Sequence, residues 1–193
     1  QECVPQEQTS TLTEQPLTSD SVSVASWNLQ VFGDAKASDG MKLEAIADII
    51  NDYDIVAVQE IRDADGSSID LLMGSVGEGY NIVVGPRVGR SVSKEQYAFI
   101  YKRAYVLKES HTFEDVNDVF EREPFIATFD VGEYDITLVD VDARPEDATK
   151  EILSLYDIPI YTDNAIILGD LNADCDYYDE DTPEQYDWVI PDS

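Results

Sequence analysis

The chain has 193 residues, of which 43% are hydrophobic and 10% aromatic. Its 12 Lys and Arg residues against 41 Asp and Glu residues give a formal net charge of 12 − 41 = −29 at pH 7. This apolar content excludes a disordered acidic chain, which pairs high charge with few apolar residues. The length suffices for one full α/β core. No stretch approaches the ~18 consecutive apolar residues of a membrane span, so we expect a soluble domain with no membrane partner.

The acidic residues are spread over every segment of the chain instead of forming one tail. Two explanations remain open: a surface adapted to concentrated salt, or a surface that recognises a basic partner. A dedicated basic partner would favour one acidic patch. The even spread therefore favours adaptation to salt.

Residues 1–20 are rich in Gln, Thr, Ser, Glu and Pro and show no periodicity, which predicts a flexible leading segment before a domain over residues 21–193. The pattern then changes. Apolar residues alternate with serines in SVSVASWNLQ, which is typical of a strand. A helix is predicted over GMKLEAIADIINDY, where one face carries Leu43, Ile46, Ala47 and Ile50. A continuous buried strand, DIVAVQE, and a short helix, SSIDLLMGSV, follow.

Five strands are predicted next, in YNIVVG, QYAFIYKR, AYVLKESHTF, PFIATFDV and YDITLVDVDA. The segment EDATKEILSLYD returns to a helix that aligns Ala148, Ile152, Leu155 and Tyr156, and NAIILGDLN is predicted to be another buried strand. Helices between buried strands, with a run of antiparallel-looking strands between them, indicate a mixed α/β sandwich with its helices outside.

Polar side chains fall where the predicted strands end, at Asn28, Glu60, Asp142, Asp170 and Asn172. Carboxylate and amide oxygens without nearby thiols suit a hard cation such as Mg²⁺, which also binds substrate phosphate. The alternative is that each residue caps or solvates a strand end, and for any one residue alone this is the better explanation. Four strands that end in the same way favour a site.

The chain begins with Gln1 and carries no apolar signal-peptide core. We therefore expect a trimmed precursor and a secreted, extracellular protein. The two cysteines, Cys3 and Cys175, form neither a metal-cluster spacing nor a disulfide framework.

Seven segments follow one another in a familiar order and approximate spacing: SWNLQVFG, DIVAVQEIRD, GRSVSKEQYAFIYK, EREPF, ARPEDATKEILSLYD, LGDLNADCDYY and WVIPDS. From about Val22 to Ser193 the chain resembles the deoxyribonuclease I branch of the endonuclease/exonuclease/phosphatase superfamily. This resemblance implies a four-layer αββα sandwich and hydrolysis of phosphodiester bonds in DNA. It also implies a divalent metal, Mg²⁺ first, with Mn²⁺ and Ca²⁺ as alternatives.

The resemblance extends to individual residues. Glu60 resembles the metal ligand, with Asn28 beside it. Asp170 and Asn172 resemble the pair that supports the attacking water and the scissile phosphate, so Asp174 and Asp176, which follow them, are expected to be loop and surface acids. Glu95 matches the acid that orients a catalytic histidine. The residues that resemble DNA contacts are Gln30, Arg62, Arg90 and Arg122.

One stretch of the acidic chain is basic. Residues 85–103 contain a single acidic residue, Glu95, against the cations Arg87, Arg90, Lys94, Lys102 and Arg103. Contact with DNA and a pair of ordinary solvated loops both explain this composition.

The resemblance fails where the family places a catalytic histidine and this chain has Asp142. The only histidine, His111, matches no catalytic segment and is expected at the surface or in packing. Glu95 then faces a second carboxylate, which should raise one pKa or recruit a cation. Asp142 becomes a candidate weak base or metal ligand. We expect lowered activity, because general acid–base catalysis is typically worth ~10²–10⁴ in rate.

Two further departures concern the DNA contacts and the C-terminus. Ser93 stands in the place of a DNA-stacking tyrosine. The family also continues past WVIPDS into a segment that supplies a second catalytic histidine and further strands. We expect this chain to lack that segment and its second sheet to have an exposed edge.

Two interpretations stay open on these grounds. The chain is either an excerpt of a working nuclease, or a degenerate paralogue that binds cations or nucleic acid without cutting. A phosphomonoesterase or lipid phosphodiesterase of the same superfamily is disfavoured by the nuclease-type segments.

Transfer from molar salt to dilute buffer is expected to unfold the protein. Self-repulsion of a net charge of −29 destabilises a compact state, whereas the screening length falls to about 3 Å at 1 M salt. Circular dichroism at both salt concentrations measures the effect. A spectrum that stays the same in dilute buffer would contradict adaptation to salt.

Overall fold

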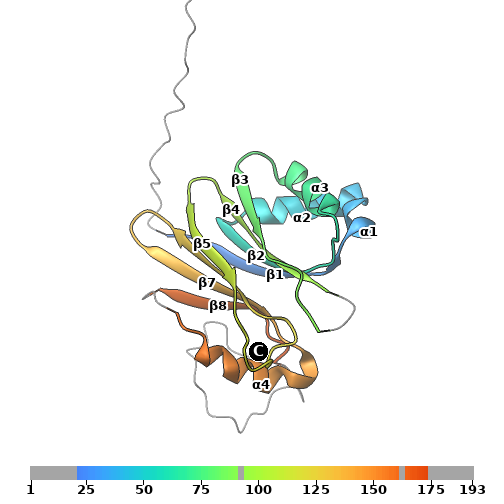
Figure 1. Ribbon diagram of the computed structural model, residues 1–193. Coiled ribbons are helices and arrows are strands. Elements are labelled where there is room, and N and C mark those ends of the chain that lie inside the picture. Colours follow the sequence, from blue (N-terminus) through green and yellow to red (C-terminus); the bar gives the residue numbers. More distant parts are fainter. Residues whose placement is uncertain (1–20, 91–93, 161–163, 174–193) are drawn as a thin grey trace, which may run out of the picture.

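Two four-stranded sheets pack face to face in the computed structural model, which describes residues 21–90, 94–160 and 164–173 (Figure 1). The first sheet has the order β1 (Val24–Phe32), β2 (Ile55–Ile61), β4 (Gln96–Lys102) and β3 (Tyr80–Val84). The second has the order β5 (Val106–Thr112), β6 (Phe125–Asp130), β7 (Asp135–Asp142) and β8 (Ala165–Asp170). Each of these strands was predicted from the sequence.

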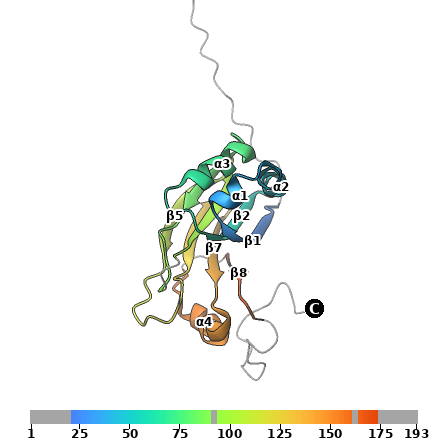
Figure 2. The ribbon, with the colours of Figure 1, turned by 90° about the vertical axis from the view of Figure 1, so that its right-hand side faces the viewer.

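Helices cover the outer faces of the two sheets (Figures 1 and 2). The first sheet carries α1 (Asp34–Ala37), α2 (Gly40–Asn51) and α3 (Ser67–Val76). On the second sheet, α4 (Ala148–Ser154) lies over one end, between the 3₁₀ turns η1 (Pro145–Asp147) and η2 (Leu155–Asp157). The predicted αββα sandwich is therefore confirmed.

The core has separate layers between and outside the sheets. Between them, the Phe99 ring of β4 stacks on Phe125 with centroids 5.6 Å apart and meets Phe129 edge-on at 5.8 Å. Outside the first sheet, α2 buries the four apolar residues that its periodicity predicted, Leu43, Ile46, Ala47 and Ile50. Asp39 caps this helix by accepting the N–H of Lys42.

Two sequence predictions fail near the end of the described chain. β8 was expected to be buried, but its residues are exposed or half-buried, because among the described strands it pairs with β7 alone. Tyr156 was expected on the apolar face of the last helix, yet it is 66% exposed. The α-helix ends at Ser154, and the chain continues as a tighter 3₁₀ turn, which moves Tyr156 off that face.

Several predictions fall on residues outside the described ranges. These are the leading segment over residues 1–20, Cys3, Ser93, Asp174, Cys175 and Asp176. No helix in the described part of the chain has the length and apolar character needed to cross a membrane.

Replacement of Gly169 by alanine is expected to destabilise the fold strongly. Gly169 has φ +140°, and a Cβ there would lie 1.9 Å from the carbonyl oxygen of Val141 on the neighbouring strand. The strain and the clash together should cost about 3 kcal/mol or more in the free energy of unfolding, measured by urea denaturation in molar salt. Gly74 is the matched control, since a Cβ in this helical position meets nothing within 4 Å. Gly74→Ala is expected to be neutral or stabilising by up to about 1 kcal/mol, and equal losses at both sites would contradict the prediction.

Candidate active site

The two sheets bring three predicted site residues together at one edge of the sandwich. Asn28 lies in β1, Glu60 in the parallel neighbour β2, and Asp170 at the end of β8 in the other sheet. The Asn28 Nδ2 group donates to Glu60 Oε1 and to Asp170 Oδ2, both at 2.9 Å. One amide group therefore joins two carboxylates from opposite sheets.

A strained bulge in β1 orients these side chains. The pairing with β2 shifts between Asn28 and Phe32, and Gln30 and Val31 have φ of 50° and 62°. Such left-handed values are uncommon outside glycine and a genuine outlier for a β-branched residue. The N–H of Gln30 donates to Asn28 Oδ1 at 2.7 Å, and that of Val31 donates to Glu60 Oε2 at 2.8 Å. The bulge thus aims two backbone donors at the site, and strain of this kind concentrates at functional sites.

Glu95 is held between two arginines. Its carboxylate is 2% exposed, and Arg62 Nη2 lies 2.6 Å from Oε1 while Arg122 Nε lies 2.9 Å from Oε2. Arg62 also approaches Glu60 at 3.9 Å, and Arg122 approaches Asp142 Oδ2 at 3.6 Å. The sequence predicted that the carboxylates of Glu95 and Asp142 would raise one pKa or recruit a cation, and Arg122 lies between them.

Asp142 ends β7 beside Asp170, its register partner on β8. Its backbone N–H donates to the Tyr97 hydroxyl at 3.0 Å, and the residue is 4% exposed. Burial raises the pKa of Asp142 to about 7; the nearby negative charges, Glu95 first, act in the same direction, and Arg122 opposes them. A carboxyl group that titrates near neutral pH can both accept and donate a proton there.

Asn172 joins the ends of the two last strands. Its Nδ2 donates to the Ala143 carbonyl at 2.9 Å, and its N–H donates to Asp170 Oδ1 at 3.2 Å. The residue has φ 47°, which is again left-handed. Asn172 therefore lies next to Asp170 and holds the segment after β7 against the end of β8.

Two buried acids, Asp140 and Glu151, were not predicted from the sequence. Asp140 is fully buried in β7, where Gln59 Nε2 of the other sheet donates to it at 2.5 Å, and burial raises its pKa well above the usual range. Glu151 of α4 is also fully buried and accepts the N–H groups of Glu121 at 2.9 Å and Arg144 at 3.4 Å. Glu151 thus anchors the chain beside Arg122 and beyond Asp142. Asp140 could have been predicted as a buried acid, because it is a charged residue within the apolar stretch of a strand.

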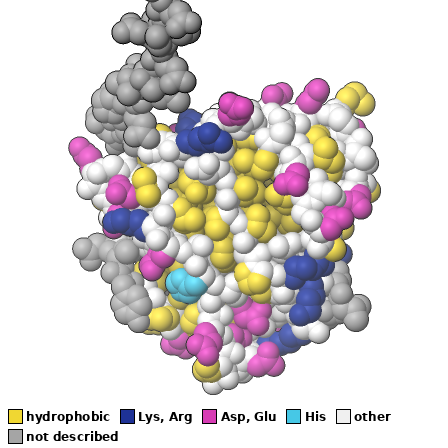
Figure 3. Space-filling view, turned by 45° about the horizontal axis from the view of Figure 1, so that its top comes forward, with side chains coloured by type: hydrophobic (Ala, Val, Ile, Leu, Met, Phe, Trp, Pro, Cys, Tyr) yellow, Lys and Arg dark blue, Asp and Glu magenta, His cyan; other side chains and the backbone are white. Residues whose placement is uncertain are grey.

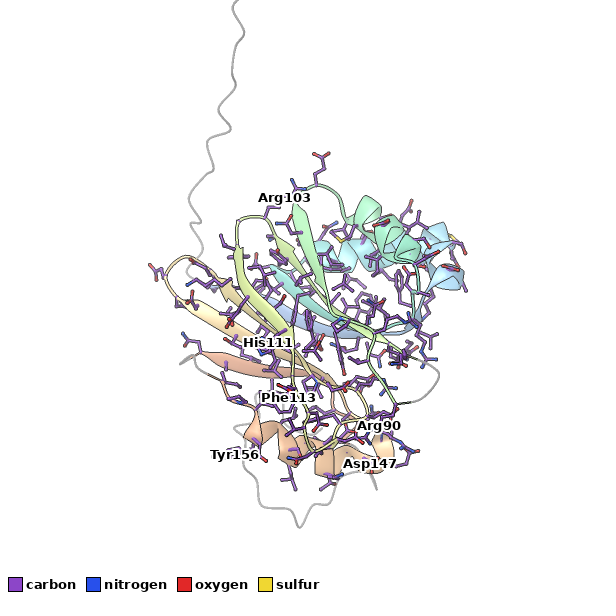
Figure 4. The ribbon with its side chains drawn as sticks, in the orientation of Figure 1. Arg90, Arg103, His111, Phe113, Asp147 and Tyr156 are labelled. Carbon is purple, nitrogen blue, oxygen red and sulfur yellow. The ribbon has the colours of Figure 1, made fainter. Side chains whose placement is uncertain are left out.

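The basic stretch over residues 85–103 does not form one surface. Arg90 and Arg103 lie at opposite ends of the fold (Figure 4). Lys102 pairs with Asp54 at 2.9 Å, and Arg90 pairs with Asp118 at 2.9 Å. Figure 3 shows Lys and Arg side chains at the lower right of the face in view and, apart from these, near its top and its left margin, with acidic side chains close to each group.

The other predicted DNA contacts lie close to the carboxylates. Gln30 belongs to the bulge, Arg62 follows β2, and Arg122 precedes β6. In contrast, His111 lies exposed on β5, which is at the opposite edge of the second sheet from β8 (Figure 4).

The oxygen donors of this site fit a hard divalent cation. Within the described ranges no three His, Cys, Asp or Glu side chains converge into a ready metal cluster, since the Asn28 amide nitrogen lies between Glu60 and Asp170. Four carboxylates nevertheless share the site with two guanidinium groups, which leaves 4 − 2 = 2 excess negative charges when all are ionised. Glu60 and Asp170 are half-buried and supply only oxygen, the ligand atom that Mg²⁺ and Ca²⁺ prefer.

Comparison with known proteins identifies the class. The Endonuclease/Exonuclease/phosphatase family matches residues 25–187, so the chain belongs to this family. Its relatives include Deoxyribonuclease-1-like 2 of Mus musculus, 36% identical over 88% of this chain and 69% of that protein. Deoxyribonuclease-1 of Gallus gallus is 35% identical over 88% of this chain and 70% of that protein.

Solved structures show the same fold at lower identity. Truncated TDP2 of Caenorhabditis elegans superposes with a TM-score of 0.58 at 20% identity, covering 82% of this chain and 65% of that one. A family protein of Leptotrichia buccalis gives 0.58 at 16% identity, covering 79% of this chain and 67% of that one. The SeMet structure of C. elegans TDP2 gives 0.56 at 21% identity, and there this chain spans 47% of its length.

Asp142→Asn is expected to remove part of the pH dependence of stability. The folded protein keeps the Asp142 proton up to about pH 7, whereas an unfolded chain releases it near pH 4. Raising the pH through this window therefore lowers the free energy of unfolding of the parent, by an amount on the order of 3 kcal/mol. The asparagine variant has no such proton to lose. Urea denaturation at pH 4.5 and 8, at fixed molar salt, measures the difference.

Asp48→Asn, at an exposed position of α2, is the control. It should keep the pH dependence of the parent. If Asp142→Asn keeps it too, the proposed titration of Asp142 is wrong.

Proposed function

We propose that this chain is a deoxyribonuclease I-like endonuclease domain that hydrolyses phosphodiester bonds in DNA with the help of a divalent cation. The observation that carries the proposal is the single amide of Asn28 bridging Glu60 and Asp170 across the two sheets. Membership of the Endonuclease/Exonuclease/phosphatase family and relatives named deoxyribonucleases support the reaction and the substrate.

Glu60 and Asp170, with Asn28, are the residues that would hold the cation. Mg²⁺ is the first choice, and Mn²⁺ and Ca²⁺ suit the same oxygen donors. A bound divalent cation supplies stabilisation of the negative charge that develops on a phosphate. Asp170 and Asn172, joined by a hydrogen bond, would orient the attacking water and the scissile phosphate.

Asp142 would take the proton of the attacking water. Its pKa of about 7 is close to the value of ~6.5 for the histidine that the family resemblance places there. The charge differs, however, because the base form is an anion instead of a neutral ring, and an anion repels phosphate. We therefore expect Asp142 to work more slowly than histidine.

Gln30, Arg62, Arg90 and Arg122 would contact DNA. Contacts to phosphate weaken as salt rises, so in a salt-rich setting hydrogen bonds from Gln30 and groove insertion by Arg62 would carry a larger share. The net charge of −29 supports that setting. Secretion stays a prediction.

A second candidate function is binding of cations or nucleic acid without cleavage. The observation that favours it is the pairing of Arg122 with Glu95 and Asp142, because a guanidinium held by two carboxylates is less available to a phosphate. Asp142 at the position where the family resemblance expects a histidine also favours binding without cleavage.

Nicking of supercoiled plasmid DNA by the chain, with Mg²⁺ in molar salt, tests the proposal. The parent should nick slowly, and Asp142→His should nick faster, within the range of about 10²–10⁴ that acid–base catalysis typically contributes. Glu60→Gln should abolish nicking, because it removes a charged cation ligand.

Asp48→His, on the exposed face of α2, controls for the added histidine and should nick like the parent. If neither the parent nor Asp142→His nicks while both bind DNA or Mn²⁺, the non-catalytic function replaces the proposed one.

A further inference from the structure

The ammonium group of Lys36 lies against the strained bulge of β1. Lys36 belongs to the short helix α1, which begins directly after Gly33. Its Nζ donates to the carbonyl oxygen of Leu29 at 2.6 Å and to that of Gln30 at 2.5 Å. Because the donor carries a full charge, these hydrogen bonds are stronger than neutral ones.

Each of these carbonyls shares a peptide plane with an N–H group that faces the site. The Leu29 carbonyl and the Gln30 N–H belong to one plane, and that N–H donates to Asn28 Oδ1. The Gln30 carbonyl and the Val31 N–H belong to the next plane, and that N–H donates to Glu60 Oε2. A peptide unit is rigid, so each plane is held at its oxygen by Lys36 and at its nitrogen by a site side chain.

The backbone of the bulge needs such support. Gln30 and Val31 both adopt the left-handed region, and the pairing with β2 shifts at this point. Conformations of this kind persist only where the surroundings hold them in place. The Lys36 ammonium group is a contact that holds both peptide planes at once.

We propose that Lys36 is a positioning residue for the candidate metal site: by fixing the two peptide planes of the bulge, it orients the Asn28 and Glu60 side chains toward a divalent cation. This inference rests on the proposed function. Residues that orient metal ligands typically change metal affinity by about 10- to 100-fold when they are replaced. The same loss is expected here.

Calorimetric titration of Mn²⁺ into the metal-free protein, in molar salt, is the first measurement. Lys36→Met, which keeps the length of the side chain without its charge, should bind Mn²⁺ about 10- to 100-fold more weakly than the parent. Lys36→Arg should recover part of the loss. The matched control is Lys42→Met at a lysine whose side chain is 63% exposed and pairs with Asp39, and its affinity should equal that of the parent.

Amide hydrogen exchange, followed by nuclear magnetic resonance without metal, gives a readout that needs no metal binding. In Lys36→Met the amides of Gln30 and Val31 should exchange about tenfold faster or more, while the amides of β4 stay unchanged. A general loss of stability would instead speed exchange throughout the core. If Lys36→Met is unfolded by circular dichroism, Lys36→Gln, which keeps a donor without charge, replaces it in both measurements.

The outcomes separate the two proposals. If neither the parent nor any variant binds Mn²⁺, the proposed metal-dependent function is wrong. The exchange rates of the Gln30 and Val31 amides then still show whether Lys36 holds the bulge. If these amides exchange at the parent rate in the folded variant, or if Mn²⁺ affinity is unchanged in a chain that binds Mn²⁺, Lys36 is not a positioning residue.

Discussion

Several carboxylates lie close together at one edge of the sandwich, and the local structure depends on donor groups that separate them. Carboxylates alternate there with donor groups in a continuous series of contacts between 2.6 and 3.9 Å: Asp142, Arg122, Glu95, Arg62, Glu60, Asn28 and Asp170. Each acid is separated from the next by a guanidinium or an amide group. The series draws on both sheets, because β1 and β2 deliver one half of it and β7 and β8 deliver part of the other. The site is thus also a junction that fixes how the two sheets meet.

One pair of neighbouring acids in this series has no guanidinium or amide group between its members. Asp142 and Asp170, the two ends of this series, are register partners on β7 and β8. Two neighbouring carboxylates repel one another unless one takes up a proton. Burial is the main cause of the pKa of about 7 at Asp142; Arg122 lowers this pKa, and the charges of Glu95 and then Asp170 raise it. The histidine that the family resemblance places at this position would supply a donor there. In this chain the position holds a second acid beside Asp170 in place of a donor.

Periodicity in the sequence predicted most elements, because burial on one face leaves a regular pattern in α2 and an unbroken apolar run in β2. The prediction that β8 is buried was wrong. A buried strand and an edge strand can share the same apolar composition, and the sequence of a strand does not say which strands pair with it. The candidate site residues Asn28, Glu60 and Asp170, which the structure brings together, were singled out from strand ends and from a family resemblance. Lys36 and Glu151 were not, because their acceptors and donors are backbone groups, which every residue carries and no motif marks.

High salt affects the surface and the site differently. Exposed charges are screened within a few ångströms at molar salt, whereas buried pairs are screened much less. Glu95 and Asp142 are 2% and 4% exposed, so the contacts between these acids and the arginines should persist under conditions that remove most of the repulsion between the outer acidic residues. Long-range attraction of DNA is removed by the same salt. Under the proposed function, DNA would therefore be recognised mainly through direct contacts at the site, where the strained bulge of β1 carries Gln30 beside the candidate cation ligands.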